Sequence, residues 1–290
     1  MSQSIRLDQT QLVQYKEKGY VLIEDVLSPD QLTAMKHRAQ KIVRDDIQQS
    51  LSDDTNSKVF TTRHNDRTGN LFFLDSAEKI RCFFEEDAFN ADGHLTQKPE
   101  LCINKIGHGL HELDPVFNEI SHLPGLGSIA KQLGLVQPEI RQSMYIFKQP
   151  RIGGVVNWHQ DATYFYSTPQ SVVTYWFAIE DATLENGCLW VEENNVDREL
   201  REVFQRDGDV TSMIQLDDAP WPDDSNAIPI EVKARSLLCF AGNIAHYSAP
   251  NTSNKSRHAY TLHVTDGTTN YSSKNWLQAK ELPLRGFKSD

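Results

Sequence analysis

The first fifty residues of the chain carry apolar positions at helical spacing. Leu12 and Tyr15 lie on one face of a predicted helix, and Gly19 ends it. A short apolar strand, "YVLIEDVL", follows. Ser28 then stands three residues before Gln31, with a proline directly after the serine, and this pattern predicts a capped second helix. That helix continues with apolar residues at helical spacing: Leu32, Met35, Ala39, Ile42 and Val43.

From Ser143 onward the pattern changes to short apolar runs that are typical of strands. These runs are rich in β-branched and aromatic residues: "SMYIFKQP", "VVTYWFAI", "CLWV", "IPIEV", "SLLCFAG" and "HAYTLHV". Their spacing predicts an antiparallel sandwich or barrel. No GxGxxG or Walker sequence opens a helix, which argues against a nucleotide-binding α/β fold. We therefore expect a mainly β protein with flanking α-helices, folded as a single domain over residues 1–290.

A long polar stretch from Asp45 to Asn70 separates these two patterns and lacks a clear hydrophobic period. Connections of this length without structure of their own are uncommon in compact domains, and many of them are functional lids. We expect this stretch to be a loop that is mobile without ligand and becomes more ordered when substrate binds.

Composition narrows the possible functions. The chain is 39% hydrophobic and 24% charged, as in ordinary globular proteins, and its net charge of −11 argues against binding to a nucleic-acid backbone. None of the four cysteines forms a CxxC pair. The N-terminus lacks a signal-peptide core, and no apolar run is long enough to span a membrane. We expect a cytoplasmic protein that binds neither nucleic acid nor membranes.

The stretch "NWHQDATYFY" places a histidine and an aspartate two residues apart. If this stretch is a strand, His159 and Asp161 point to the same face and can offer a nitrogen and an oxygen to one ion. His246, just after the apolar run "LLCFAGNIA", is a candidate third ligand. Two histidines and one carboxylate on a triangular face, with open positions opposite, suit non-haem Fe(II).

Arg257 stands just before the alternating run "HAYTLHV". An arginine can hold a carboxylate through two parallel hydrogen bonds. A 2-oxoglutarate-dependent oxygenase requires both a metal triad and such an arginine. Its co-substrate chelates iron at one end, and the distal carboxylate needs a cationic anchor.

A histidine and an aspartate at this spacing also occur by chance, and the chain has a second instance, His64-Asn65-Asp66, in a polar stretch. We interpret that second instance as a solvated loop. On spacing alone, His159 and Asp161 could also be two polar residues at the rim of a strand. The remaining histidines form no comparable constellation and are interpreted as surface or core residues: His37, His94, His108, His111, His122, His258 and His263.

Several longer stretches resemble the phytanoyl-CoA dioxygenase family: "KIRCFFEEDAF", "INKIGHGLHELDPVF", "QSMYIFKQP", "HQDATYFY", "WFAIEDATLENGCLW", "HYSAPNTSNKSRHAYTLHV" and "NWLQ". Together they extend over most of the chain. The resemblance implies an iron(II)- and 2-oxoglutarate-dependent oxygenase on a double-stranded β-helix, the jelly-roll or cupin-like core.

The resemblance also implies roles for individual residues. His159, Asp161 and His246 would be the ligands of Fe(II), and Arg257 would anchor 2-oxoglutarate with Ser248 beside it. O₂ would be the second co-substrate, and ascorbate would stimulate the reaction. Three further residues would form walls of the co-substrate pocket: Lys105, Met144 and Trp176.

By pattern alone, Met144 and Trp176 would be ordinary core residues on strands, and Lys105 would be a surface charge. The chain also departs from the family where "LWxxPGSH" is usual, because it continues "LWVEENNVDREL". This departure leaves the metal ligands untouched and changes the adjoining loop. No substrate role can be assigned to the acidic stretch "QRDGDVTSMIQLDDAPWPDDSNA" that follows.

We expect a dioxygenase that hydroxylates a C–H bond of a small molecule and releases succinate and CO₂. Tyr164, Phe165 and Tyr166 fit either an aromatic pocket wall or plain core packing. Two alternatives stay open: a cupin-like metalloenzyme of different chemistry, and a metal-binding protein that kept the fold without catalysis. Formation of succinate from 2-oxoglutarate would separate them from the oxygenase.

Overall fold

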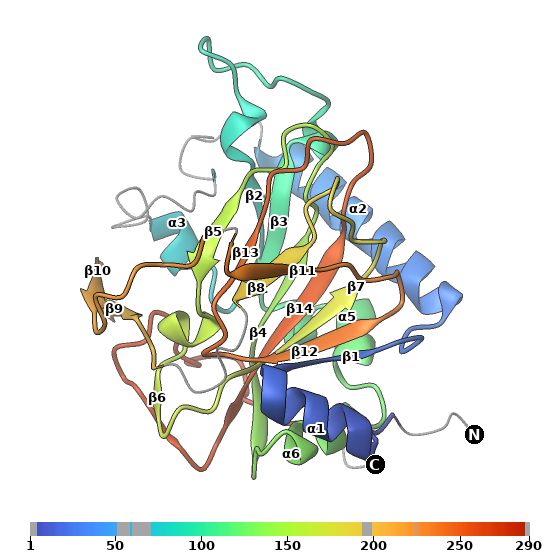
Figure 1. Cartoon of the computed structure of the whole chain (residues 1–290). Helices are drawn as coiled ribbons and strands as arrows, with labels where there is room; N and C mark the ends of the chain where they lie inside the picture. Colours follow the sequence, from blue (N-terminus) through green and yellow to red (C-terminus); the bar gives the residue numbers. More distant parts are fainter. Residues whose placement is uncertain (1–4, 51–58, 60–70, 193–198, 224, 288–290) are drawn as a thin grey trace.

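A seven-stranded sheet forms the centre of the computed structural model, which describes residues 5–50, 59, 71–192, 199–223 and 225–287 (Figure 1). All neighbouring strands in this sheet are antiparallel. Their order across the sheet is β1 (Tyr20–Ile23), β12 (Leu237–Ala241), β7 (Val173–Ala178), β14 (Ala259–Asp266), β4 (Pro138–Ile146), β3 (Ile103–His108) and β2 (Ile80–Phe84).

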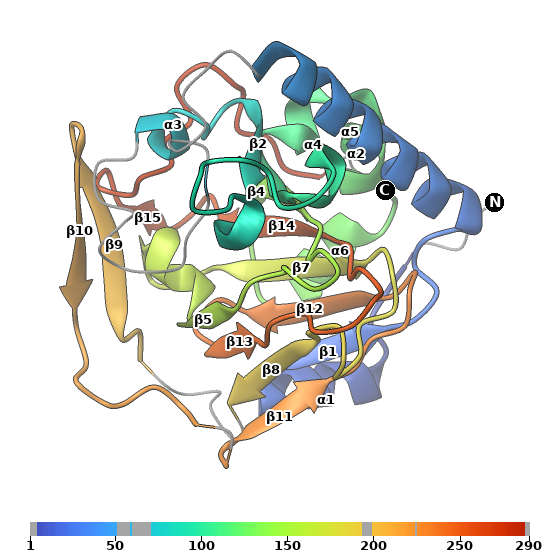
Figure 2. The same ribbon diagram turned by 90° about the horizontal axis from the view of Figure 1, so that it is seen from above.

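A smaller sheet forms a second layer against one face of the large sheet (Figure 2). Its order is β11 (Ala227–Ile230), β8 (Leu189–Glu192), β13 (His246–Ser248) and β5 (Val156–His159). Two strand pairs lie outside both sheets: β9 (Glu202–Asp207) with β10 (Val210–Gln215), and β6 (Ser167–Thr168) with β15 (Asn270–Tyr271). The mainly β architecture predicted from the apolar runs is confirmed. The β9–β10 hairpin occupies part of the acidic stretch to which the sequence assigned no element.

Helices cover the other face of the large sheet. Gly19 ends α1 as predicted, with φ of 73°. The start of α2 is also as predicted, because the Ser28 hydroxyl and the Gln31 side chain cap each other's backbone there. The helices are α1 (Gln9–Lys18), α2 (Pro29–Ser50), α3 (Leu71–Leu74), α4 (Leu110–Leu113), α5 (Pro115–Ser121) and α6 (Leu126–Gln132), with 3₁₀ turns η3 (Glu86–Ala88), η4 (Pro99–Leu101) and η5 (Asp161–Tyr164).

The central strands are apolar on both sides because each side is covered. In β7, Tyr175 and Phe177 belong to the core under the helices, whereas Trp176 and Ala178 belong to the core between the two sheets. This burial on both faces explains why "VTYWFA" reads as a continuous apolar run instead of an alternating one. Residues of the inner face are therefore positioned by both sheets.

The predicted loop from Asp45 to Asn70 is wrong for its first residues, because α2 continues to Ser50. Lys41 pairs with Asp45 one turn later at 2.6 Å, and Ile47 packs against the core. Apart from Val59, which forms a parallel bridge with Phe84, the rest of this stretch lies outside the described residues. His64-Asn65-Asp66 lies there too.

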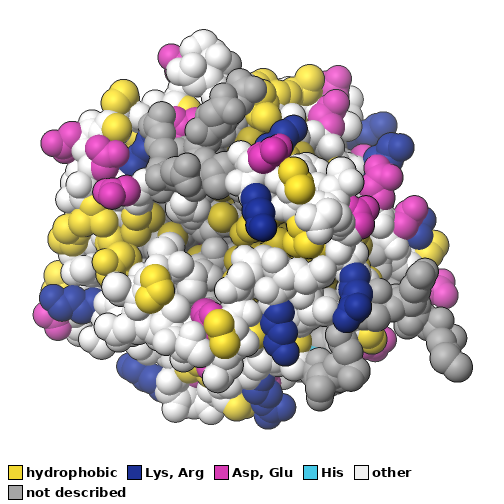
Figure 3. Space-filling model, turned by 60° about the horizontal axis from the view of Figure 1, so that its bottom comes forward, with side chains coloured by type: hydrophobic (Ala, Val, Ile, Leu, Met, Phe, Trp, Pro, Cys, Tyr) yellow, Lys and Arg dark blue, Asp and Glu magenta, His cyan; other side chains and the backbone are white. Residues whose placement is uncertain are grey.

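Charged side chains are dispersed over the face of the molecule that Figure 3 shows. The Lys and Arg side chains on this face stand apart from one another, separated by neutral and acidic atoms. Among the described residues, no helix is long and apolar enough to cross a membrane.

Candidate active site

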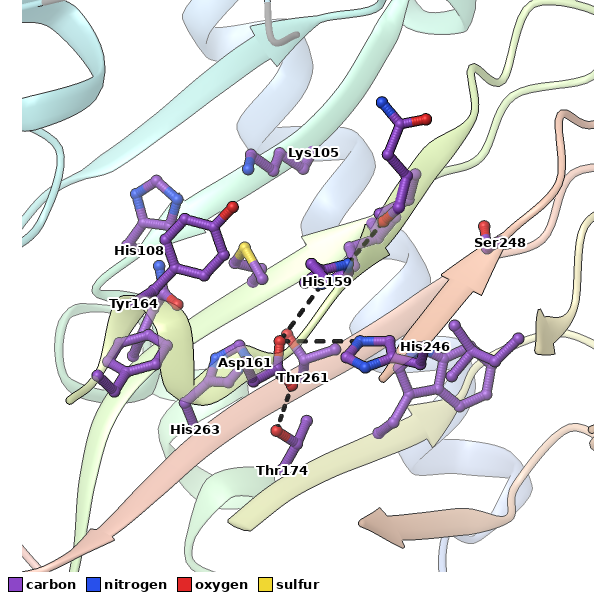
Figure 4. A pocket seen from close by; sticks show the side chains of 18 of the residues that line it. Lys105, His108, His159, Asp161, Tyr164, Thr174, His246, Ser248, Thr261 and His263 are labelled. Atoms are coloured by element: carbon purple, nitrogen blue, oxygen red, sulfur yellow. Dashed lines mark hydrogen bonds and ion pairs between the residues drawn. The ribbon is translucent and has the colours of Figure 1, made fainter. Parts of the chain in front are cut away.

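A pocket lies among the inner-face side chains of both sheets (Figure 4). β3, β4, β7 and β14 contribute to it from the large sheet, and β5, β8 and β13 contribute from the small sheet. Every site residue that the sequence singled out lines this pocket: Lys105, Met144, His159, Asp161, Trp176, His246, Ser248 and Arg257.

The two residues of the HxD pair lie on different elements, so the prediction that both stand on one strand is wrong. β5 ends at His159, and Asp161 begins η5. Gln160 between them keeps an extended backbone, with φ of −115° and ψ of 133°, and its buried amide donates to the Asn243 carbonyl at 2.7 Å. The two side chains therefore still converge, with His159 Nε2 at 3.5 Å from Asp161 Oδ1.

His246 joins this pair through strand pairing. It is the direct partner of His159 in the antiparallel pairing of β13 with β5, and the two ring centroids lie 4.2 Å apart. His246 Nε2 lies 3.8 Å from Asp161 Oδ1. The ligand atoms of the three residues all fall within 4.8 Å of one another, a set that could hold a metal ion.

Backbone carbonyls determine the tautomers of both histidines. His159 Nδ1 lies 2.8 Å from the Asn157 carbonyl, and His246 Nδ1 lies 3.1 Å from the Ile244 carbonyl. A carbonyl oxygen can only accept, so both Nδ1 atoms carry a hydrogen, and in the neutral imidazole that metals bind each Nε2 presents a lone pair towards Asp161. In these forms two imidazole lone pairs and a carboxylate oxygen converge, an arrangement that a bound cation would satisfy.

The charge states suit metal binding as well. Burial, together with the neighbouring His159 ring, lowers the pKa of His246 to about 4. Burial by itself would raise the pKa of Asp161, but the nearby His263 and His246 rings lower it well below its usual range. Neutral imidazole and ionised carboxylate are the forms that coordinate metals.

His263 is a buried histidine, one of the two possibilities that the sequence left open, and it stands behind Asp161. Its Nε2 lies 3.4 Å from Asp161 Oδ2, which also accepts a hydrogen bond from the Thr174 hydroxyl at 2.5 Å. The His263 ring stacks on Phe165 at 4.7 Å. Alternation along "RHAYTLHV" could have revealed it, because Arg257, Thr261 and His263 are spaced by even numbers of residues and all line the pocket.

Arg257 is buried at another part of the pocket. Its Nε donates to the Gly187 carbonyl at 3.1 Å, and its Nη2 donates to the Ser248 hydroxyl oxygen at 3.2 Å. The guanidinium carbon lies 5.4 Å from the Trp176 ring centroid. Nη1 is buried and has no partner among the described residues. The Nε and Nη2 groups are therefore hydrogen-bonded within the protein, and Nη1 can donate to a ligand.

Lys148, which the sequence analysis missed, is buried next to Arg257. Its ammonium donates to the Ser248 hydroxyl oxygen at 2.7 Å, to the Gly154 carbonyl at 2.6 Å and to the Ser248 carbonyl at 3.3 Å. Burial and the Arg257 charge lower its pKa well below the usual value for lysine. A lysine inside the apolar run "MYIFKQP" was the available signal, because such a residue must find partners in the interior.

The family model described as phytanoyl-CoA dioxygenase (PhyH) matches residues 15–259. This chain belongs to the phytanoyl-CoA dioxygenase family. It is 39% identical to the phytanoyl-CoA dioxygenase of Arabidopsis thaliana over 94% of each chain, and 41% identical to phytanoyl-CoA dioxygenase 1 of Oryza sativa subsp. japonica over 96% of each. It is also 39% identical to phytanoyl-CoA dioxygenase domain-containing protein 1 of Mus musculus, over 96% of this chain and 97% of the mouse protein.

Solved structures show the same fold at low identity. The α-ketoglutarate-dependent carbocyclase SnoK matches with a TM-score of 0.62 and 18% identity, over 92% of this chain and 87% of SnoK. EctD from S. alaskensis with 2-oxoglutarate and 5-hydroxyectoine matches with a TM-score of 0.58 and 18% identity, over 98% and 86%. The cupin-like core predicted for the family is thereby confirmed. Family and fold together make the chain a 2-oxoglutarate-dependent dioxygenase.

The weaker family positions also line the pocket, in surroundings that the apolar pattern alone did not predict. Lys105 is buried instead of exposed, and its ammonium lies 5.7 Å and 5.6 Å from the ring centroids of Phe73 and Phe83. Met144 and Trp176 occupy strand positions whose side chains face the pocket. In the loop that replaces the family's "PGSH", residues 193–198 lie outside the described part of the chain.

At Gly187 the backbone passes close to the Lys148 side chain. A methyl group added there would lie 2.6 Å from the Ala249 carbonyl oxygen and 2.7 Å from Lys148 Cε, on a backbone with φ of 83°. Gly208, with φ of 62°, has nothing within 4 Å of that position. We expect Gly208→Ala to cost about 1 kcal/mol of unfolding free energy for the left-handed backbone, and Gly187→Ala to cost about 1–3 kcal/mol more. Urea unfolding measures both, and equal costs would contradict the close approach.

Proposed function

We propose that His159, Asp161 and His246 hold Fe(II), and that the enzyme hydroxylates a C–H bond of a small molecule with 2-oxoglutarate and O₂ as co-substrates. The observation that carries this proposal is the convergence of two imidazole Nε2 atoms and a carboxylate, with both Nδ1 hydrogens directed to backbone carbonyls. Imidazole and carboxylate donors are those of facial non-haem iron sites. We propose further that residues 1–290 act as one domain.

When bound, the iron supplies the oxidation. One oxygen atom of O₂ enters the substrate as a hydroxyl group, the other enters succinate, and the carboxyl carbon of 2-oxoglutarate leaves as CO₂. Ascorbate would stimulate turnover by keeping iron reduced. The protein's own task is to hold the co-substrate, to orient the substrate and to exclude water.

Arg257 and Ser248 suit the distal carboxylate of 2-oxoglutarate. Ser248 Oγ accepts from Lys148 Nζ and from Arg257 Nη2, which occupies both of its lone pairs. Its own O–H is therefore left to donate. A carboxylate could accept from this hydroxyl and from the unpartnered Arg257 Nη1.

Lys148 would support this anchor without touching the co-substrate. All three of its hydrogen atoms have acceptors within the protein, two of which belong to Ser248. It fixes the orientation of the serine hydroxyl. Lys105, Met144 and Trp176 would complete the walls of the co-substrate pocket.

The triad predicts loss of metal binding in each single variant. His159→Ala, Asp161→Ala and His246→Ala should each lower Fe(II) affinity by at least about 100-fold and reduce succinate release to background, with the fold retained by circular dichroism. His64→Ala and His94→Ala are matched controls that should keep wild-type turnover. Full activity in any triad variant would remove that residue from the metal site, and loss of metal in His64→Ala would mean that the other HxD pair is the ligand.

The arginine predicts a change confined to co-substrate binding. Arg257→Leu removes the charged partner of a buried carboxylate, which typically costs on the order of 2–5 kcal/mol, or roughly 30-fold or more in affinity for 2-oxoglutarate. The affinity of Arg257→Lys for 2-oxoglutarate should lie between that of Arg257→Leu and that of the wild type. The affinity for Fe(II) should stay unchanged in both variants. Titration of succinate release with 2-oxoglutarate measures this, with exposed Arg151→Leu as control. A change within a factor of about two would exclude Arg257 as the anchor.

Lys148 predicts an effect that depends on Ser248. Lys148→Met should raise the KM for 2-oxoglutarate about tenfold, because the serine loses its fixed orientation. In a Ser248→Ala background the same change should have little further effect, since the hydroxyl is already absent. Lys255→Met, at an exposed lysine, serves as control. Equal effects in both backgrounds would mean that Lys148 acts on stability alone.

A further inference from the structure

His108 lines the pocket but belongs to neither the metal triad nor the co-substrate anchor. In Figure 4 it lies with Tyr164 on one side of His159, Asp161 and His246, while Ser248 lies on the other side. If the Ser248 side holds 2-oxoglutarate, as the proposed function requires, the His108 side is left for the primary substrate. The following argument rests on that proposed function.

The proton on the His108 ring can be assigned from its neighbour. The Ser76 hydroxyl donates to the Phe73 carbonyl, which can only accept. A hydroxyl has a single hydrogen, so Ser76 Oγ must accept from His108 Nδ1, which lies 2.7 Å away. Burial and the nearby Lys105 charge lower the pKa of His108 well below its ordinary value, so the ring is neutral. Nε2 therefore carries a lone pair and no hydrogen.

That lone pair has no partner in the described part of the protein. Nε2 is buried, and His108 as a whole is fully buried. The ring is surrounded by other rings, with centroids of Phe73, Phe83 and Trp276 at 5.4 Å, 5.5 Å and 5.3 Å. Buried acceptors are normally paired in native proteins, so an unpaired one beside a pocket calls for a ligand that donates.

The surroundings of His108 indicate the rest of the ligand. Phe73 and Trp276 line the pocket as a stacked pair, with centroids 4.5 Å apart and ring planes 25° apart. Phe165 and Tyr164 line the same pocket. Aromatic walls of this kind favour a flat or apolar body.

We propose that the primary substrate has an apolar or aromatic ring bearing an O–H or N–H group, and that it donates this hydrogen to His108 Nε2. The bond would select for the substrate and fix its orientation in front of the metal centre. A site that accepts a hydrogen bond discriminates strongly against an analogue that lacks the donor, because the acceptor is then left unpaired. Ser76 acts as a positioning residue, because it keeps the ring in the accepting tautomer.

Matched probe pairs test this proposal in the protein loaded with Mn(II) and 2-oxoglutarate. Indole is compared with 1-methylindole, and phenol with anisole, because in each pair a methyl group replaces the hydrogen that would be donated. Relaxation of the probe's ring protons by Mn(II) reports binding next to the metal. Wild-type protein should bind the donor-bearing member of each pair roughly tenfold more tightly.

Three variants separate the hydrogen bond from steric fit. His108→Phe keeps a ring and should abolish the preference, while His108→Gln retains an acceptor and should preserve part of it. Ser76→Ala frees the tautomer and should weaken the preference without removing a pocket side chain. His94→Phe, at an exposed histidine, should leave the preference as in wild type.

Binding of Mn(II) and 2-oxoglutarate by the wild-type protein is measured first and tests the proposed function alone. If that binding is intact, a preference that persists in His108→Phe overturns the present proposal. Equal binding within both pairs in the wild-type protein does so too, as does failure of all four probes to bind at millimolar concentration.

Discussion

Two histidine Nε2 atoms and a carboxylate oxygen converge in the pocket, and the rest of the pocket is built around this arrangement. It arises because the Asn157 and Ile244 carbonyls each take the Nδ1 hydrogen of a histidine. Thr174 and His263 hold the other oxygen of Asp161. The backbone of β5 and of the turn before β13, together with side chains of β7 and β14, therefore prepares a site suited to a cation.

Elsewhere in the pocket, too, some donors and acceptors are paired within the protein and others are left for a ligand. At one end, Lys148 and Arg257 saturate the Ser248 oxygen and leave donors for an anion. On the His108 side, Ser76 saturates Nδ1 and leaves an acceptor. The pocket therefore has hydrogen-bond donors at one end, the candidate metal ligands in the middle, and an acceptor among aromatic rings on the other side. The proposed co-substrate and substrate would therefore meet different hydrogen-bonding groups within one cavity.

The two-layered core surrounds these few polar atoms with apolar side chains, which makes each hydrogen bond important for stability. The large sheet is covered by helices on one face and by the small sheet on the other, so side chains between the sheets lie in an apolar interior. An unpaired charge or lone pair is expensive there, and each polar group is held in one orientation by a specific partner. Gly187 shows how tightly this is built, since its missing side chain makes room for Lys148.

The sequence by itself determined the strands of the long apolar runs, the helix signals at Gly19 and Ser28, the metal-ligand candidates His159, Asp161 and His246, and the candidate anchor Arg257. Those features depend on local spacing or on long matching stretches, and both are visible in a linear chain. Only the tertiary structure decided that Lys105 and Lys148 are buried, that Asp161 begins a 3₁₀ turn beyond the strand, and that His263 and His108 reach the pocket. These depend on which distant strands are paired and on which carbonyl or hydroxyl stands beside each ring, and no local period in the sequence records either.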